Sequence, residues 1–368
     1  MRYRVSTSIS ASIATIAVVA ALVGCARVSR TGLVTTIPAV SLVAEEPSSL
    51  YSLASSSVPS TVHESHTLSL ALDRIDQRMP PLDRTYRHVG SGRGVTVYVF
   101  DGGVSTEHPQ LVGRVRTGFT GFPDDPKVCN AHGTAVAGAI AGTTLGVAPD
   151  AEIVDVKMVQ CEKLRGTIKA IVDGAHWVIK DHKERPGPAV GNWSFIADTS
   201  ARIPALDSAV AALRANGIAV IVSAGNMDID ACRVSPGNSQ GTIVVGASAV
   251  DVDTSAALAQ MVDRRAAGTA WGPCIDLYAP GDSVLLPSLD HEMKPISQLW
   301  NGTSMAAGYV SGAAALFLEA HPLASPDQVA EALKHNATAD VIRDAHTPFT
   351  RMLFVGMRQG IPLKVAAR

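Results

Sequence analysis

Charged and aromatic side chains are scarce in this sequence. They make up 17% and 5% of the 368 residues, the formal net charge is −2, and no run of Lys and Arg exceeds two residues. Nucleic-acid-binding proteins usually carry a basic patch or stripe, so we expect no nucleic-acid partner. Apolar residues reach 46%, enough for a large core. These values exclude a coiled coil, a polybasic binder and a fully disordered chain.

The N-terminus has the features of a secretory signal. Arg2 and Arg4 precede an apolar run over 9–23, which is short for a membrane-spanning helix. The run ends in Leu-Val-Gly-Cys, which resembles the bacterial lipobox, where the cysteine is lipidated and becomes the new N-terminus. We therefore expect a lipoprotein-type signal over 1–24 and a lipid anchor at Cys25, holding the protein at a membrane surface of the bacterial cell envelope. The alternative is an ordinary signal and a secreted protein.

Cysteine is sparse, and no CxxC pair is present, which argues against structural zinc. Apart from Cys25, four cysteines remain, an even number that suggests two disulfides in an exported protein. Their spacing alone leaves three pairings open. These cysteines are Cys129, Cys161, Cys232 and Cys274.

A change of composition divides the chain near residue 68. Residues 28–67 contain 15 Ser and Thr and few charges, a composition that buries little surface. We therefore predict a Ser/Thr-rich tether over 25–67, with His63 and His66 as solvated side chains, and a folded domain over 68–368.

Strand and helix patterns alternate in the folded domain. Such alternation predicts an α/β fold with a mostly parallel sheet covered by helices on both faces, and a site at the carboxyl ends of the strands. The expected strands are 95–100, 153–158, 189–193, 218–223 and 242–247, and the expected helices are 134–141, 166–180, 203–215 and 305–320.

Four polar residues stand at the ends of these elements. Asp101 follows a strand, His132 and Ser304 each open a helix, and Asn226 closes a Ser-Ala-Gly-Asn segment after a strand. Alone, each has an ordinary explanation as a turn former or helix cap. Together they suit nucleophilic catalysis, because a serine needs a histidine base and the histidine needs an orienting carboxylate. A helix N-terminus and an amide side chain would stabilise an oxyanion.

These segments resemble proteinase K-type subtilisin-like proteases. The resemblance implies a three-layer fold and gives Asp101 as orienter, His132 as base then acid, Ser304 as nucleophile and Asn226 as oxyanion donor, with no cofactor for catalysis. It is carried by Leu-Asp-Arg-Ile-Asp from Leu72, the stretch around Asp101, His-Gly-Thr-Ala-Val-Ala-Gly at 132–138, Gly-Val-Ala-Pro at 146–149, Ser-Ala-Gly-Asn at 223–226, Gly-Thr-Ser-Met-Ala at 302–306 and Ser-Pro-Asp at 325–327.

The resemblance also implies several supporting features. It pairs Cys129 with Cys161 and Cys232 with Cys274. It gives two substrate-binding edges, against which a peptide pairs as an added strand, and a structural calcium held by oxygen ligands. The edges are Ser194, Phe195 and Ile196 on one side and Ser223, Ala224 and Gly225 on the other; the calcium ligands are backbone oxygens of Gln240 and Thr242 and the carboxylate of Asp276.

The sequence departs from the family pattern in four places. Gly102 stands where the family has Thr or Ser, and Ser-Phe-Ile-Ala at 194–197 stands where it has Ser-Leu-Gly-Gly. The segment 26–67 is too short and polar for the family's inhibitory pro-domain. About eleven additional residues lie between Ser248 and Asp276, where we expect a surface loop.

These patterns predict an extracytoplasmic serine endopeptidase that acts as a monomer on peptide or protein substrates. The alternative is a peptide-binding scaffold of the same fold, weakened as a catalyst by Gly102 and Ile196. An α/β-hydrolase esterase is a third interpretation, because Gly-Asn-Ser-Gln-Gly at 237–241 matches G-x-S-x-G. That motif needs a strand before it and a helix after it, whereas here a Pro-containing loop precedes it and a strand follows.

Overall fold

The computed structural model describes residues 62–125, 127–197, 202–253 and 260–356. All of them fall in one compact unit, residues 53–368. The predicted signal, Cys25 and most of the predicted tether lie outside the described residues. No helix within the described ranges is long and apolar enough to cross a membrane.

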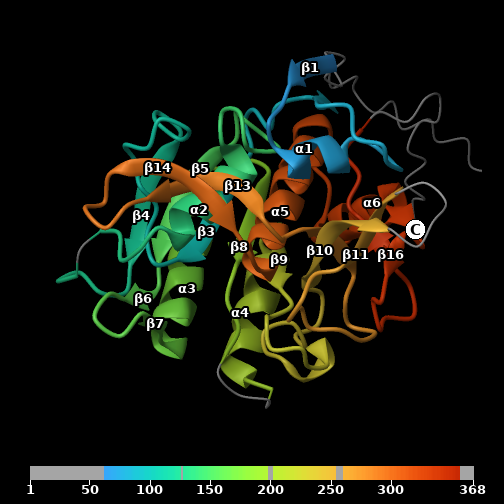
Figure 1. The fold of residues 1–368 in the computed structure, drawn as a ribbon. Helices are drawn as coiled ribbons and strands as arrows, with labels where there is room; N and C mark the ends of the chain where they lie inside the picture. Colours follow the sequence, from blue (N-terminus) through green and yellow to red (C-terminus); the bar gives the residue numbers. More distant parts are fainter. Residues whose placement is uncertain (1–61, 126, 198–201, 254–259, 357–368) are drawn as a thin grey trace, which may run out of the picture. The chain divides into compact units, whose positions relative to one another are not determined.

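A large, mostly parallel sheet forms the centre of this unit (Figure 1). Its strand order is β15-β17-β12-β10-β9-β8-β3-β5-β4, with β11 and β16 attached beside β10. The neighbours from β4 to β12 all pair in parallel. The strands are β3 (Thr96–Asp101), β4 (Val115–Thr120), β5 (Glu152–Lys157), β8 (Ala189–Trp193), β9 (Ala219–Ser223), β10 (Ile243–Asp253), β11 (Gln260–Arg265), β12 (Leu277–Pro280), β15 (Thr338–Ala339), β16 (Ile342–Arg343) and β17 (Arg351–Met352).

Helices pack on the sheet in two groups, α2 with α5 and α3 with α4. Small residues let α2 and α5 approach closely: a Cβ added at Gly308 of α5 would lie 2.9 Å from the Ala139 Cβ of α2. This arrangement is the predicted three-layer α/β fold. The helices are α1 (Leu70–Ile75), α2 (His132–Ala141), α3 (Ile168–Glu184), α4 (Pro204–Ala215), α5 (Thr303–Ala320) and α6 (Pro326–Asn336), with a short 3-10 turn at Ala231–Arg233.

Among the described residues, three two-stranded antiparallel sheets lie outside the central sheet. They are β1 (Val62–His66) with β2 (Thr85–Val89), β6 (Val159–Gln160) with β7 (Arg165–Gly166), and β13 (Val284–Leu289) with β14 (Pro295–Trp300). Strand β1 includes His63 and His66, within the segment predicted as tether. Its residues are exposed as expected, but they pair with β2 in register from Val62 opposite Val89. The tether composition did not reveal this backbone pairing.

Every strand and helix expected from the sequence is present, within a few residues except where β10 runs longer. The stretch between Ser248 and Asp276 differs from the expected surface loop, because β10 continues to Asp253 and returns as β11. Asp263 of β11 forms a buried ion pair with Arg74 of α1, with an N–O distance of 2.6 Å. A buried charge is costly unless it is paired, so this contact fixes β11 against the N-terminal helix.

Candidate active site

Asp101 and His132 form a hydrogen-bonded pair at the carboxyl edge of the sheet. Asp101 is the last residue of β3, and His132 is the first of α2. The Nδ1 atom of His132 lies 2.8 Å and 3.0 Å from the two carboxylate oxygens. A carboxylate only accepts, so Nδ1 carries the proton and Nε2 is left as the basic nitrogen.

The surroundings of His132 act on its pKa in opposite directions. Burial lowers the pKa of the imidazole, whereas the charge of Asp101 and its hydrogen bond raise it, and the net result is a pKa above the usual value. The side chain is 31% exposed, and the ring of Trp300 meets it edge-on with centroids 6.1 Å apart. His132 is therefore a partly accessible base with a fixed orientation.

Ser304 lies in the first turn of α5, after Gly302. Gly302 has a φ of 133°, which residues with a side chain rarely adopt. The Ser304 hydroxyl donates to the Ser194 carbonyl at 3.2 Å, and the Ser194 hydroxyl donates to the Ser304 carbonyl at 3.0 Å. This reciprocal pair fixes the start of α5 against the end of β8. In this conformation the Ser304 hydroxyl is engaged with Ser194 and not with His132.

Asn226 lies beside the same helix start, just after β9. Its Oδ1 accepts hydrogen bonds from the Thr303 backbone N–H at 2.9 Å and from the Thr303 hydroxyl at 3.0 Å. These two donors fix the orientation of the amide, so the other atom is the donor nitrogen. That Nδ2 lies 3.1 Å from the position a Cβ would take on Gly302. The structure thus brings a hydrogen-bond donor next to the turn that carries Ser304.

Asp155 is a buried carboxyl that the sequence analysis missed. It lies on β5, is 5% exposed, and its Oδ1 has no hydrogen-bond partner within the described residues. Burial raises its pKa to about 8; the Val104 N–H and Lys157 oppose the rise, and the charge of Asp101 adds to it. The signal in the sequence was an Asp between the apolar residues Ile153, Val154 and Val156 of this strand.

The disulfides have the pairing that the resemblance implied. Cys129 joins Cys161 with Cα atoms 4.7 Å apart, and Cys232 joins Cys274 with Cα atoms 5.2 Å apart. Cys129 also donates its backbone N–H to the Gly102 carbonyl at 2.8 Å. The first bridge therefore supports the loop that follows Asp101.

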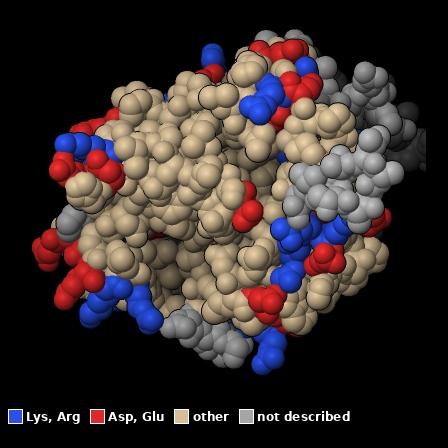
Figure 2. All heavy atoms as spheres, in the orientation of Figure 1, with Lys and Arg blue, Asp and Glu red and all other residues tan. Residues whose placement is uncertain are grey.

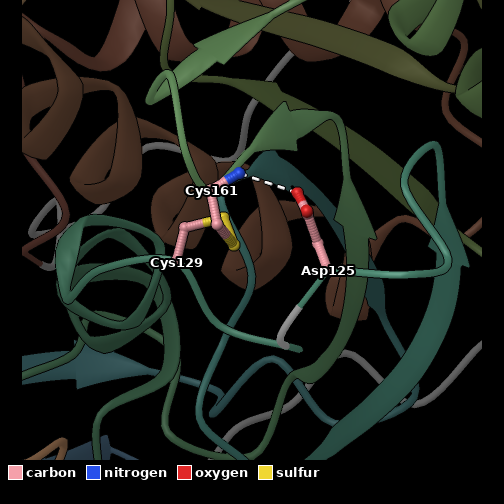
Figure 3. Close-up of side chains that lie close together, drawn as sticks. All are labelled: Asp125, Cys129 and Cys161. Atoms are coloured by element: carbon pink, nitrogen blue, oxygen red, sulfur yellow. Dashed lines mark hydrogen bonds between the residues drawn. A yellow bond between two sulfur atoms is a disulfide. The ribbon is translucent and has the colours of Figure 1, made fainter.

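Asp125 lies beside the first bridge, as Figure 3 shows. Its carboxylate accepts the Cys161 N–H at 2.7 Å and lies 3.4 Å from the Lys157 ammonium. The Asp125 oxygen and the two sulfurs are close enough to share a metal ion. Because the sulfurs are bonded to each other, they are not thiolate ligands. Asp125 instead accepts the Cys161 backbone N–H and pairs with Lys157.

The predicted substrate edges flank Ser304. The Ser223 hydroxyl donates to the Phe195 carbonyl at 3.4 Å, and the Gly225 N–H donates to the Thr303 hydroxyl at 3.1 Å. Ala224 is fully buried. The ends of β8 and β9 therefore form two adjoining walls beside the helix start, and Ile196 lies on the first of them.

The predicted calcium ligands have a mixed environment. Asp276 accepts the Val244 N–H at 3.0 Å, and the Lys334 ammonium lies 3.9 Å from its other oxygen. Burial raises the pKa of Asp276, while the charges of Lys334 and Arg351 oppose the rise. Oxygen atoms of this carboxylate and of the Gln240 and Thr242 backbone suit calcium chemically, but the Lys334 ammonium already lies beside the carboxylate. This donor set fits calcium poorly, and calcium stays a prediction of the resemblance.

The esterase motif does not form a nucleophile elbow. Ser239 is 4% exposed, and its hydroxyl donates to the Asp207 carboxylate at 2.5 Å. A turn precedes it and strand β10 follows, the reverse of the strand-then-helix context that the motif requires. Ser239 is a structural residue.

Comparisons with known proteins agree with this geometry. The family model described as "Subtilase family" matches residues 92–351. An extracellular serine proteinase of Thermus sp. (strain Rt41A) is 39% identical over 276 residues, covering 74% of this chain and 62% of the relative. An alkaline serine exoprotease A of Vibrio alginolyticus is 35% identical over 285 residues, covering 77% of this chain and 49% of the relative. The chain thus spans between about half and two thirds of these relatives.

A solved structure shows the same fold. It is the crystal structure of a cold adapted subtilisin-like serine proteinase, with a TM-score of 0.69 and 34% identity. The match covers 80% of this chain and all of the other.

Asp155 makes the stability of the protein pH-dependent. Burial raises the pKa of its carboxyl from the ordinary value of 3.8 to about 8 in the folded protein. The folded state therefore binds the proton more tightly, and the free energy of unfolding falls as pH rises from about 4 to about 8. We expect Asp155→Asn to raise the melting temperature at pH 8 and to have little effect near pH 4. Melting temperatures of the parent and of Asp155→Asn between pH 4 and pH 8 test this prediction, with Asp327→Asn as a surface control. A change of melting temperature that is the same at all pH values would contradict it.

Proposed function

The chain belongs to the subtilase family, and on that premise we propose that it is a serine endopeptidase with Ser304 as nucleophile. The observation that carries the proposal is the Asp101–His132 pair, placed at the same edge of the sheet as Ser304 and Asn226. Figure 2 shows a face of the protein that is hollowed and mostly uncharged at its centre, with most charged side chains near its rim. Such a surface suits a peptide better than a nucleic acid.

The proposed reaction begins with a rotation of the Ser304 hydroxyl from Ser194 toward His132, a change of one side-chain torsion. Nε2 of His132 takes the hydroxyl proton while Oγ bonds to the scissile carbonyl carbon. The carbonyl oxygen becomes negative, and Asn226 Nδ2 and a backbone N–H at the start of α5 donate to it. His132 then gives its proton to the amide nitrogen, the C–N bond breaks, and the acyl group stays on Ser304.

Water completes the cycle by the same steps. His132 takes a proton from water as the water oxygen bonds to the acyl carbon, and then returns a proton to Ser304 Oγ as the ester bond breaks. Asp101 keeps Nδ1 protonated throughout and stabilises the imidazolium. The departures at Gly102 and Ile196 favour a second candidate, a peptide-binding scaffold with little turnover.

We also propose that the protein is exported and anchored through a lipid on Cys25. The apolar run followed by Leu-Val-Gly-Cys supports this, as does the relative named as an extracellular proteinase. Metabolic labelling with a fatty acid in a bacterial host should mark the wild type and not Cys25→Ser. Unlabelled wild-type protein in the culture medium would favour secretion instead.

Substitutions at the site separate the enzyme from the scaffold. Ser304→Ala and His132→Ala should each reduce kcat by more than about 10⁴-fold, and the double variant should be little worse because the residues act as a unit. Asn226→Ala should reduce kcat by about 10²–10³-fold through loss of one oxyanion donor. Hydrolysis of a peptide ester measures turnover, and covalent labelling by a fluorophosphonate measures whether Ser304 is reactive. An unlabelled wild-type Ser304 would support the scaffold, and wild-type turnover in Ser304→Ala would refute the assignment.

Gly102→Ser tests the missing hydroxyl beside Asp101. Gly102 is not among the positive-φ glycines, and an added Cβ would lie 3.5 Å from the Cys129 Cβ, an ordinary contact. A serine hydroxyl there would donate to the Asp101 carboxylate and help to hold His132. We expect kcat/KM on a small ester to rise about fivefold, corresponding to about 1 kcal/mol of the bond. Gly102→Ala is the matched control, and an equal change in both variants would contradict a role for the hydroxyl.

A further inference from the structure

The carboxyl ends of β8 and β9 separate after running in parallel. Their residues pair from Val190 opposite Ala219 to Trp193 opposite Val222. Beyond this point, 194–197 and 223–226 are two walls, each joined to the start of α5 by the Ser304–Ser194 and Thr303–Gly225 hydrogen bonds. Crevices outside the carboxyl ends of parallel strands are the usual ligand sites of such folds.

The acyl residue of a substrate must enter between these walls. Its carbonyl carbon has to reach Ser304 Oγ, which faces Ser194 on the first wall, and its oxygen has to reach Asn226 on the second. The side chain on the adjacent Cα is then directed into the space between 194–197 and 223–226. The walls therefore decide which side chain fits.

Ile196 occupies this space. A Cβ added to Gly225 would lie 3.2 Å from Ile196 Cδ1 and 3.4 Å from its Cγ2, so the Ile196 side chain already packs on the opposite wall. Gly225 has a φ of 102°, which leaves that wall without a side chain of its own. The two walls are thus bridged by one aliphatic side chain.

The backbone holds Ile196 in this position. The Phe195 ring stacks on the buried Trp193 ring, with centroids 5.4 Å apart. The Ile196 side chain lies instead against Gly225, the residue before Asn226. The Phe195 carbonyl accepts from Ser223, and the Ala197 N–H donates to the Ser235 carbonyl at 2.8 Å. These bonds fix the segment on both sides of Ile196.

We propose that Ile196 is a specificity-determining residue that closes the space for the acyl-side residue, so that the enzyme cleaves after glycine or alanine and excludes large side chains. This rests on the proposed peptidase function. A glycine or alanine keeps its backbone at Ser304 without displacing Ile196. A phenylalanine or leucine has to displace it and loses the burial that would otherwise favour binding.

The test compares peptide esters that differ only in the acyl-side residue: glycine, alanine, leucine or phenylalanine. In the parent protein, kcat/KM should be at least about 10-fold higher for alanine than for phenylalanine. Ile196→Gly should raise the phenylalanine-to-alanine ratio by about 10–100-fold, the range expected from burying one large apolar side chain. Ile196→Ala should give a smaller rise, and the volume-conserving Ile196→Leu should leave the ratio near that of the parent.

Two further measurements separate the possible failures. Fluorophosphonate titration gives the fraction of active protein in each variant, so a loss through misfolding is not counted as a change of specificity. The affinities of Ser304→Ala for the same set of peptides, with and without Ile196→Gly, show which acyl-side residues fit between the walls when no hydrolysis takes place. If nothing is hydrolysed or labelled, the proposed function fails, while these affinities still test Ile196. A parent that accepts phenylalanine as well as alanine, or a ratio unchanged in Ile196→Gly, would overturn the inference.

Discussion

The contact between α2 and α5 is the constraint on which the site depends. These helices begin at His132 and Thr303, so their packing determines how far His132 lies from the turn that carries Ser304. Glycines on α5 make the contact close: a Cβ at Gly308 would lie 2.9 Å from the Ala139 Cβ of α2, and one at Gly312 would lie 3.0 Å from the Ile140 carbonyl oxygen of α2. Protein interiors accommodate added volume poorly. A side chain at either position would push the two helix starts apart.

The sheet completes the site from the other side. Asp101 ends β3, Ser194 follows β8 and Asn226 follows β9, and parallel pairing brings the ends of these strands to one edge. Two helix N-termini and three strand ends therefore meet in one place, although their residues are spread over some 200 positions of the chain. This convergence explains why single residues that looked ordinary in the sequence acquire a joint role.

The sequence predicted the elements whose signal is local. Strands β3, β8 and β9 are buried on both faces, which gives continuous apolar runs. Strand β4, Val-Arg-Thr-Gly-Phe-Thr, was not expected, because it lies at the edge of the sheet and is only partly buried. The β10–β11 pair and β1 were missed for a related reason: their pairing depends on backbone partners that composition does not reveal.

Side-chain direction was the part of the site that the sequence could not supply. Ile196 was visible as a departure from a glycine pattern, yet only the structure shows that its side chain lies against Gly225 on the opposite wall. Asp155 is a second residue whose surroundings the sequence did not reveal. Burial raises the pKa of Asp155, and the charge of its neighbour Asp101 raises it further, so a second carboxyl is tolerated there in its protonated form. The charge balance beside the Asp101–His132 pair is therefore a property of the packed core, set by burial and not by a sequence motif.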